Sequence, residues 1–253
     1  MKRIFGSVRL EDFGRPGYRR FGVPPGGSFD RQAMVMANSL VGNVDQLPVL
    51  ELTLADVLFE ALQPSYLSLV SPDKAVSIRI EGGEELHVPI PDVGARTYVG
   101  ILGGFIGEKA LGSVSGQLVR TGDILSSWES KGKRGSPRNQ TIDPSVGSIR
   151  VAPGPQSGRF DFASLRYRSY RVSLQSNRAG ILLEGEPWGA TNESLSEPAC
   201  VGAIQVNNSG QLMILGPDGP TIGGYPKIAV VRNPSLRRVA QLRPGDVVQF
   251  EID

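Results

Sequence analysis

Glycine and proline interrupt this chain so often that they limit what it can fold into. The 253 residues include 32 Gly and 19 Pro, spread between short apolar segments along the whole length. A chain broken this often cannot sustain many long helices, whereas short strands joined by tight turns use both residue types. We therefore predict a mainly β protein with few helices.

Most of the short apolar segments alternate or are rich in β-branched residues, as strands are. Turn sequences such as EGG, NNSG and GPDGP separate several of them. The predicted strands cover residues 57–62, 66–71, 75–80, 85–90, 97–104, 148–154, 170–176, 180–186, 202–207, 211–217, 227–233 and 246–252.

One segment has the periodicity of a helix. Within residues 31–43, the apolar residues Ala33, Met36, Ala37 and Leu40 recur at the spacing of one helical face. Ser28 and Asp30 precede the segment as candidate capping residues, and Gly42-Asn43 ends it. We predict an amphipathic helix between these signals.

The order of short motifs along the chain indicates two related halves. The first half contains ILGGF and then LVRTGDIL, and the second contains MILGPDG and then LRPGDVVQF. Between the halves lies ESKGKRGSPRNQTIDPSVG, which is basic and has no apolar stripe. It predicts an exposed linker, although its charge run could also contact a polyanion. We place one domain at residues 1–140 and the other at 141–253.

Charge and cysteine content restrict the class of function. The formal net charge is +2, which gives no reason to expect nucleic acid or an anionic membrane as a partner. No apolar run approaches the roughly 20 residues of a membrane span. Cys200 is the only cysteine and His87 the only histidine, so we expect no metal site, a structural or exposed histidine, and a cytoplasmic location.

Two candidate functional segments are rich in glycine and proline. Residues 14–30 form a long loop before the predicted helix, where backbone amides and nearby arginines would suit an anionic group. An irregular loop that uses Pro and Gly to turn corners explains the same residues. Residues 153–160, PGPQSGRF, form a similar stretch at the start of the second half.

Two further segments concentrate functional groups in the second half. Gln175, Asn177 and Arg178 precede a predicted strand, where they indicate either turn chemistry or a site. Residues 216–229 bring together several groups of different chemistry, and the adjacent glycines let backbone approach a ligand or form a bulge. That segment contains Asp218, Thr221, Gly223, Gly224, Tyr225 and Lys227.

These segments together resemble the KipA family, which includes one of the subunits of 5-oxoprolinase, allophanate hydrolase subunit 2 and part of the carboxyltransferase domain of urea carboxylase. The matching blocks are GRPGYRRFGVPPGGSFDRQAMVMANSLVGN, LELTL, APGPQSGRF, QSNRAGILLEG, GAIQVNNSGQLMIL, IGGYPKIA and QLRPGDVVQF, in family order along essentially the whole chain. The resemblance implies two cyclophilin-like β-barrel domains.

The resemblance also implies a function within a complex. It implies a subunit, inactive alone, of an ATP-dependent 5-oxoprolinase that opens a small amide substrate, 5-oxoproline, to glutamate. Its partners would be a KipI-like subunit and a LamB/YcsF-type subunit, with ATP used by the complex and not necessarily bound by this chain. We assign Asp30, Asp218 and Lys227 to catalysis, and Arg15, Tyr18, Gln175, Asn177, Arg178, Thr221, Gly223, Gly224 and Tyr225 to substrate binding.

Two alternatives from the same family stay open. One is carboxyl transfer from biotin to urea or a related amide, and the other is a regulatory protein that binds a KipI-like kinase inhibitor and needs no active site. Two departures from the family pattern bear on activity. The segment before Leu118 is short, and Pro220 stands where the family usually has glutamine.

Overall fold

The computed structural model describes residues 1–129, 148–189 and 195–253, which cluster into two compact units. Unit 1 comprises Met1–Arg15 and Gly26–Ser145, and unit 2 comprises Pro16–Pro25 and Val146–Asp253. The predicted linker and the boundary at residue 140 lie almost entirely among residues 130–147, outside the described residues, so the domain limits stay a prediction.

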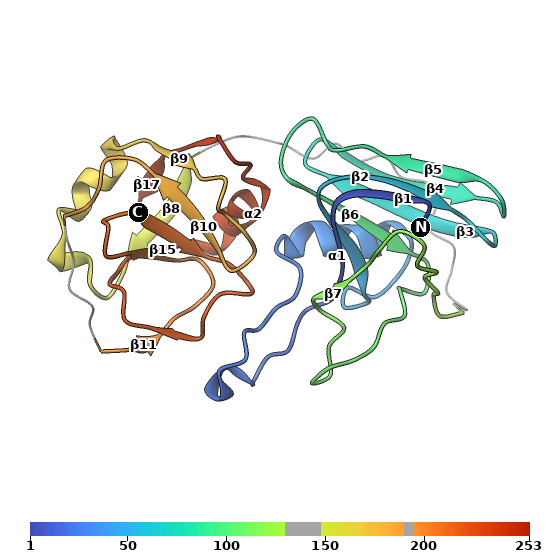
Figure 1. The fold of residues 1–253 in the computed structure, drawn as a ribbon, viewed down its shortest axis with the longest axis horizontal. Coiled ribbons are helices and arrows are strands. Elements are labelled where there is room, and N and C mark those ends of the chain that lie inside the picture. The colour runs from blue at the N-terminus through green and yellow to red at the C-terminus, as the bar shows by residue number, and fades with distance from the viewer. Residues whose placement is uncertain (130–147, 190–194) are drawn as a thin grey trace. The chain divides into compact units, whose positions relative to one another are not determined.

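Unit 1 is a seven-stranded antiparallel sheet with the order β4-β3-β6-β2-β1-β7, in which β5 pairs with β2 (Figure 1). Its strands are β1 (Arg3–Glu11), β2 (Val49–Glu60), β3 (Ser65–Ser71), β4 (Lys74–Ile80), β5 (Glu85–Val88), β6 (Arg96–Ile101) and β7 (Gln117–Leu118), and its helix is α1 (Arg31–Leu40).

The long pair of β1 and β2 forms the centre of unit 1. The register shifts between Phe5 and Ser7, where Gly6 has φ +91° and a Cβ would lie 2.3 Å from the Leu54 carbonyl oxygen. Only glycine fits this bulge, because any side chain would collide with the neighbouring strand. Apolar residues of both strands then pack inward, including Val8, Leu10, Leu50 and Leu52.

Helix α1 covers one face of this sheet and begins where the sequence predicts. The Asp30 carboxylate accepts a hydrogen bond from the Ala33 amide at 3.0 Å, which makes Asp30 the N-cap. Ser28 does not cap the helix, because its hydroxyl lies 3.0 Å from Met34 Sδ. Gly100 allows the close approach of helix and sheet, since a Cβ there would lie 2.9 Å from the Ala37 carbonyl oxygen.

Unit 2 is an eight-stranded sheet with the order β16-β9-β10-β13-β12-β15-β8-β17, beside the short pair β11-β14. All pairs are antiparallel except β17 with β8. The strands are β8 (Ile149–Pro153), β9 (Tyr170–Val172), β10 (Gly180–Glu184), β11 (Glu197–Pro198), β12 (Ala203–Val206), β13 (Leu212–Leu215), β14 (Ile222–Gly223), β15 (Lys227–Val231), β16 (Val247–Val248) and β17 (Phe250–Ile252).

Helices are few and short. Unit 2 contains α2 (Asn233–Gln241) and the 3-10 helices η1 (Arg19–Phe21), η2 (Ser157–Arg159) and η3 (Phe162–Tyr167). Apolar side chains of the central strands are fully buried, among them Ile149, Leu183, Ile204, Leu212 and Ile214. The prediction of a mainly β, barrel-forming protein with few helices is confirmed, because strands dominate and a nearly closed, barrel-like sheet is present.

Two sequence predictions need correction, and a third agrees with the structure. Residues 3–11 and 49–56, which were not predicted as strand, belong to β1 and β2. The strand predicted over 227–233 ends at Val231, because α2 begins at Asn233 with a proline in its first turn. His87 is half-exposed and its Nε2 lies 2.8 Å from Asp56 Oδ2, in agreement with the structural interpretation of this residue.

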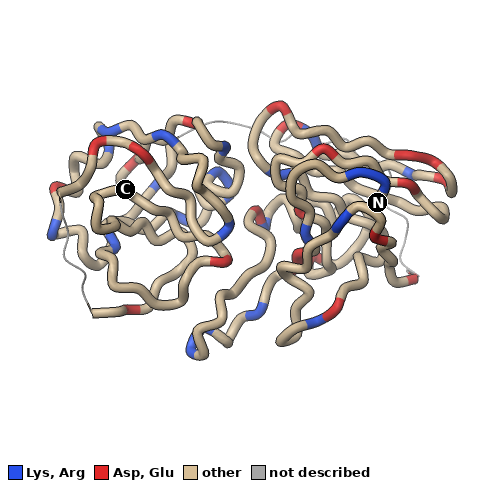
Figure 2. Tube along the Cα trace, viewed as in Figure 1, with Lys and Arg blue, Asp and Glu red and all other residues tan. Residues whose placement is uncertain are grey.

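Charges of both signs are distributed along the trace of each unit (Figure 2). Within the described residues, no helix is long and apolar enough to cross a membrane.

A buried polar network fixes the loop that leads into α1. Glu51 Oε2 accepts hydrogen bonds from the Phe29 amide at 2.9 Å and from the Tyr98 hydroxyl at 2.7 Å. The same hydroxyl accepts from the Asp30 amide at 2.8 Å. Burial, followed by the Glu51 charge, raises the pKa of Tyr98 well above its usual value, so the hydroxyl stays protonated and donates to the carboxylate.

We expect Tyr98→Phe to destabilise unit 1. The substitution keeps the ring but removes both the acceptor for the Asp30 amide and a donor to Glu51, which should cost about 1–3 kcal/mol of unfolding free energy. Urea denaturation followed by circular dichroism measures it, with Tyr167→Phe, at an 81% exposed position, as control. An unfolding midpoint equal to that of the control would contradict a stabilising role for the network.

Candidate functional site

The centre of the candidate site is Lys227, the first residue of β15. It is buried with 5% of its surface exposed, and its Nζ lies 3.1 Å from Glu197 Oε2 on β11. An ammonium group is withdrawn from water only if an opposite charge or several hydrogen bonds compensate it. The ion pair with Glu197 supplies this compensation, and it joins the main sheet of unit 2 to the short pair β11-β14.

Gln156 holds both partners of this ion pair. Its Nε2 donates to Glu197 Oε2 at 2.9 Å, and its Oε1 accepts from the Lys227 amide at 2.9 Å. The loop that carries it can lie against β15 because residue 154 is glycine: a Cβ there would be 2.2 Å from the Lys227 carbonyl oxygen. The predicted segment 153–160 therefore contributes to the site through Gly154 and Gln156.

The environment keeps Glu197 ionised. Its hydrogen bond with Lys227, and next its hydrogen bond with Gln156, lower the pKa of the Glu197 carboxyl below its usual value. The two ends of the ion pair differ in exposure, with 6% of the Lys227 side chain and 45% of the Glu197 side chain accessible. The pair thus presents a fixed anion toward solvent and a fixed cation toward the protein interior.

Gln205 completes the cluster from the neighbouring strand. It lies on β12 as the register partner of Lys227, beside a bulge between Ile204 and Gln205. Partners in register place their side chains on the same face of a sheet. A Cβ built on Gly223 would lie 3.2 Å from Gln205 Nε2, so this glycine also borders the cluster.

The remaining predicted residues of segment 216–229 surround this cluster. Thr221 is buried, and its carbonyl oxygen accepts from the Ala199 amide at 2.9 Å, beside β11. Gly224 and Tyr225 lie half-buried between Gly223 and Lys227. Pro220, the departure from the family pattern, is exposed in the turn before them.

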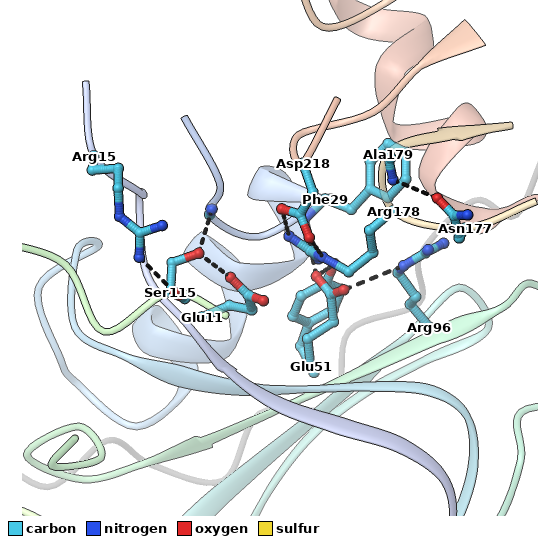
Figure 3. A network of polar contacts seen from close by, with 12 residues as sticks. Glu11, Arg15, Phe29, Glu51, Arg96, Ser115, Asn177, Arg178, Ala179 and Asp218 are labelled. Carbon is cyan, nitrogen blue, oxygen red and sulfur yellow. Dashed lines mark hydrogen bonds and ion pairs between the residues drawn. The ribbon is translucent and has the colours of Figure 1, made fainter. Parts of the chain in front are cut away.

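A second predicted group forms a separate ion pair within unit 2. Arg178 binds Asp218 with two hydrogen bonds, Nε to Oδ2 at 2.9 Å and Nη2 to Oδ1 at 3.1 Å (Figure 3). Asn177 Oδ1 accepts from the Ala179 amide at 2.8 Å, which is the turn chemistry considered for this segment, and Gln175 is exposed. Asp218 thus fixes Arg178 and the two turns that carry them.

The predicted residues of the first loop have structural contacts in the described chain. Arg15 Nη2 donates to the Ser115 carbonyl oxygen at 2.6 Å, and the Ser115 hydroxyl accepts from the Gly27 amide at 2.6 Å and donates to Glu11 (Figure 3). Asp30 is the helix cap described above. Tyr18 belongs to unit 2 and its ring centroid lies 6.4 Å from that of Phe21.

The amides of this loop already have acceptors within the protein. Those of Gly27, Ser28, Phe29 and Asp30 donate to Ser115, Asp12, Glu51 and Tyr98 respectively. They hold the loop in place, which is the structural alternative to the anion-binding hypothesis. The assignment of Arg15 and Tyr18 to substrate binding and of Asp30 to catalysis stays a prediction.

The short segment before Leu118 still closes against β1. The Gly116 amide donates to the Leu10 carbonyl oxygen at 3.1 Å, and Asp12 accepts from the Ser113 hydroxyl at 2.6 Å and the Val114 amide at 3.0 Å. The reduced length is therefore compatible with a well-bonded connection.

Three members of the cluster were not among the predicted site residues. Gln156 and Gln205 lie inside segments that carry the family resemblance, and Glu197 lies in a stretch without a distinctive motif. Within residues 1–129, 148–189 and 195–253, no group of three or more His, Cys, Asp or Glu has the arrangement of a metal site. The chemistry that the cluster offers is hydrogen bonding and charge at a small polar ligand.

Comparison with known proteins identifies the family. The model of the carboxyltransferase domain, subdomain A and B, matches residues 21–252. The chain belongs to this family. The family resemblance predicted from the sequence is thereby confirmed.

Three relatives of this carboxyltransferase family member differ in length. A 5-oxoprolinase subunit of Escherichia coli K12 is 32% identical over 95% of this chain and 86% of its own length. The urea amidolyase of Saccharomyces cerevisiae is 29% identical over 95% of this chain but only 16% of its own length. The crystal structure of TTHA0988 superposes with a TM-score of 0.87 at 28% identity and covers 97% of this chain.

The protein thus corresponds to about half of TTHA0988 (54% of its length) and to a small part of the urea amidolyase. It spans most of the 5-oxoprolinase subunit.

We expect Lys227→Met to raise the pKa of Glu197 toward its usual value, because the hydrogen bond with Lys227 is the largest cause of the lowering. A carboxyl with a lowered pKa stabilises the fold above its unfolded pKa, and this contribution is lost as pH falls through the folded value. NMR titration of the Glu197 side-chain carbon measures the change. An unchanged pKa of Glu197 would show that the ion pair does not form. Lys109→Met, which removes a positive charge at an exposed position, is the control.

Proposed function

We propose that this chain is a subunit of an ATP-dependent 5-oxoprolinase, which hydrolyses the lactam 5-oxoproline to glutamate. The observation that carries the proposal is the similarity to the bacterial 5-oxoprolinase subunit, which extends over nearly all of both chains. This chain covers 86% of the 5-oxoprolinase subunit but only 16% of the urea amidolyase. The relative of similar length supports a shared role more strongly.

The partners belong to the same proposal. We assign this chain to a complex with a KipI-like subunit and a LamB/YcsF-type subunit, and to a location in the cytoplasm. ATP is used by the complex, and the sequence has neither of the common glycine-rich phosphate-binding motifs that would place it on this chain. The chain alone is expected to be inactive.

The cluster around Lys227 fits the demands of lactam opening. Attack on an amide carbonyl develops negative charge on its oxygen, and fixed donors and cations lower the barrier most effectively in a site shielded from water. Lys227 is a buried cation held by Glu197 and Gln156, so it keeps its position while charge develops. We therefore assign Lys227 the role of offsetting charge on the substrate.

The two carboxylates predicted to be catalytic, Asp30 and Asp218, are less suited to proton transfer than Glu197. Asp30 is buried and accepts from the Ala33 amide as a helix cap, and Asp218 is held by two hydrogen bonds from Arg178. Glu197 is ionised, partly exposed and beside Lys227. We add Glu197 to Asp30 and Asp218 as a candidate for orienting or deprotonating the substrate.

Carboxyl transfer from biotin to urea or a related amide is the second candidate. The family description and the similarity to a urea amidolyase favour it. In that case Lys227 would hold a carbonyl oxygen of the acceptor amide or of the biotin ureido group. Failure of a carboxybiotin-loaded carrier to donate to urea, with both family subunits present, would count against it.

We expect the purified chain, mixed with the KipI-like and LamB/YcsF-type proteins of the same genome, to convert 5-oxoproline to glutamate only with ATP. Leaving out any one protein should abolish glutamate formation, measured by chromatography. Full activity without this chain, or none in an assembled complete complex, would refute the proposal, and the carboxyl-transfer assay would then follow.

Within an active complex, we expect Lys227→Ala to lower kcat by about tenfold or more, because a buried cation near the developing charge is lost. Lys109→Ala, which removes an exposed lysine, is the matched control and should keep full turnover. Size-exclusion chromatography of both variants checks assembly. Wild-type turnover by an assembled Lys227→Ala complex would exclude the assigned role.

A further inference from the structure

The carboxamide of Gln205 is a buried donor without an acceptor among the described residues. The residue is 1% exposed, and in the described part of the chain its Nε2 has no hydrogen-bond partner. An unsatisfied buried polar group costs about 1–3 kcal/mol, so proteins keep few of them without a reason. The buried Gln205 carboxamide, on a strand whose other residues are apolar and buried, therefore calls for a partner from outside the described chain.

Strand register and proximity connect this donor with the ion pair in a closed ring. Gln205 is the register partner of Lys227, whose Nζ lies 3.1 Å from Glu197 Oε2. Glu197 is in turn the register partner of Gly223 on β14. Gly223 closes the ring, since a Cβ on it would lie 3.2 Å from Gln205 Nε2.

The ring also contains an available acceptor. Among the described residues, the hydrogen bonds that Glu197 receives from Lys227 and Gln156 both end on Oε2. Its Oε1 belongs to a side chain that is 45% accessible, so a ligand can reach it. The described part of the cluster therefore offers a donor, an acceptor and the Lys227 cation around a glycine, and the Arg159 charge also acts on Glu197.

The position that a Cβ on Gly223 would take is largely open. Within the described residues, Gln205 Nε2 is the only atom that a Cβ on Gly223 would meet within 4 Å. Gly223 does not have the positive φ that excludes other residues. The backbone conformation therefore does not require a glycine at this position.

We propose that Gln205, Glu197 and Lys227 recognise a small cis amide, an inference that rests on the proposed function for the identity of that amide. The Gln205 amide donates to the ligand carbonyl oxygen, Glu197 Oε1 accepts the ligand N–H, and the Lys227 ammonium lies near the carbonyl oxygen. A γ-lactam presents its C=O and N–H on one edge because the ring holds the amide cis, and urea presents the same pair. Gln156 is a positioning residue, since it holds Glu197 and contacts no ligand.

Gly223→Ala tests the site by filling it. The methyl group would occupy the space 3.2 Å from Gln205 Nε2, so we expect binding to weaken about tenfold or more. Gly158→Ala is the matched control, because nothing lies within 4 Å of a Cβ there and φ is likewise not positive. Calorimetry with 5-oxoproline, 2-pyrrolidinone and urea measures binding to the full chain and to the complex assembled with its partners, without ATP.

Gln205→Leu distinguishes ligand recognition from a structural role. It removes the unpaired donor at similar volume, so we expect the urea unfolding midpoint to stay equal or rise while binding of the amide weakens about tenfold. A structural role for the carboxamide would instead lower the midpoint. In an active complex, the same variant should lower kcat/KM for 5-oxoproline, whereas Gly158→Ala should not.

The outcomes separate this inference from the proposed function. Binding of 2-pyrrolidinone or urea that Gly223→Ala and Gln205→Leu both weaken supports the site, even if the complete mixture makes no glutamate. A mixture that is active with both variants at wild-type kcat/KM overturns the site and leaves the function standing. The proposed site is also overturned if none of the three amides binds to the wild-type chain or to the complex. A water molecule would then be the partner of Gln205.

Discussion

The ion pair between Lys227 and Glu197 is the interaction on which the candidate site depends. Lys227 begins a buried strand, and a buried ammonium without a counter-charge would be strongly unfavourable. Glu197 can compensate it only because β11 pairs with β14 beside the main sheet. Together with the Arg178–Asp218 pair, the ion pair therefore helps to hold the segment from Gly216 to Lys227 in place, and with it the position of Gly223 relative to Gln205.

Two buried polar clusters, one in each unit, differ in how far their members satisfy one another. In unit 1, Glu51, Tyr98 and the amides of Phe29 and Asp30 satisfy one another, so the network fixes a loop and a helix start. In unit 2, the cluster around Lys227 leaves the Gln205 donor without an acceptor within the described chain. A fully satisfied network rigidifies a fold, whereas a partly satisfied one is unfavourable unless a ligand completes it.

The sequence predicted what depends on neighbouring residues. The α1 helix followed from its apolar spacing and the Asp30 cap, and most strands followed from short apolar segments between turns. β1 was missed because Gly6 and its charged residues disturb the alternation, and α2 because it is short and follows a strand directly. Both elements are defined by pairing or packing with distant parts of the chain, which local propensity does not contain.

The same difference between local and distant interactions explains which site residues the sequence predicted. Lys227 and Gly223 lie in one dense segment and were predicted, whereas Glu197 is 30 residues from Lys227 and enters through β11. Gln205 appeared as one polar residue in a strand, and only the register with Lys227 gives it a role. No signal in the sequence marks this burial, because a polar residue between two apolar ones is also the ordinary alternation of a half-exposed strand.

The two candidate reactions make similar demands on this cluster. Lactam hydrolysis and carboxylation of urea both act on a small molecule with an amide carbonyl and an adjacent N–H. A donor at Gln205, an acceptor at Glu197 and a cation at Lys227 suit the substrate of either reaction, so recognition by this chain does not choose between them. Under either proposal, the partner subunits would decide the chemical outcome: a phosphoryl group from ATP would lead to ring opening, and a carboxyl group from biotin would lead to carboxylation.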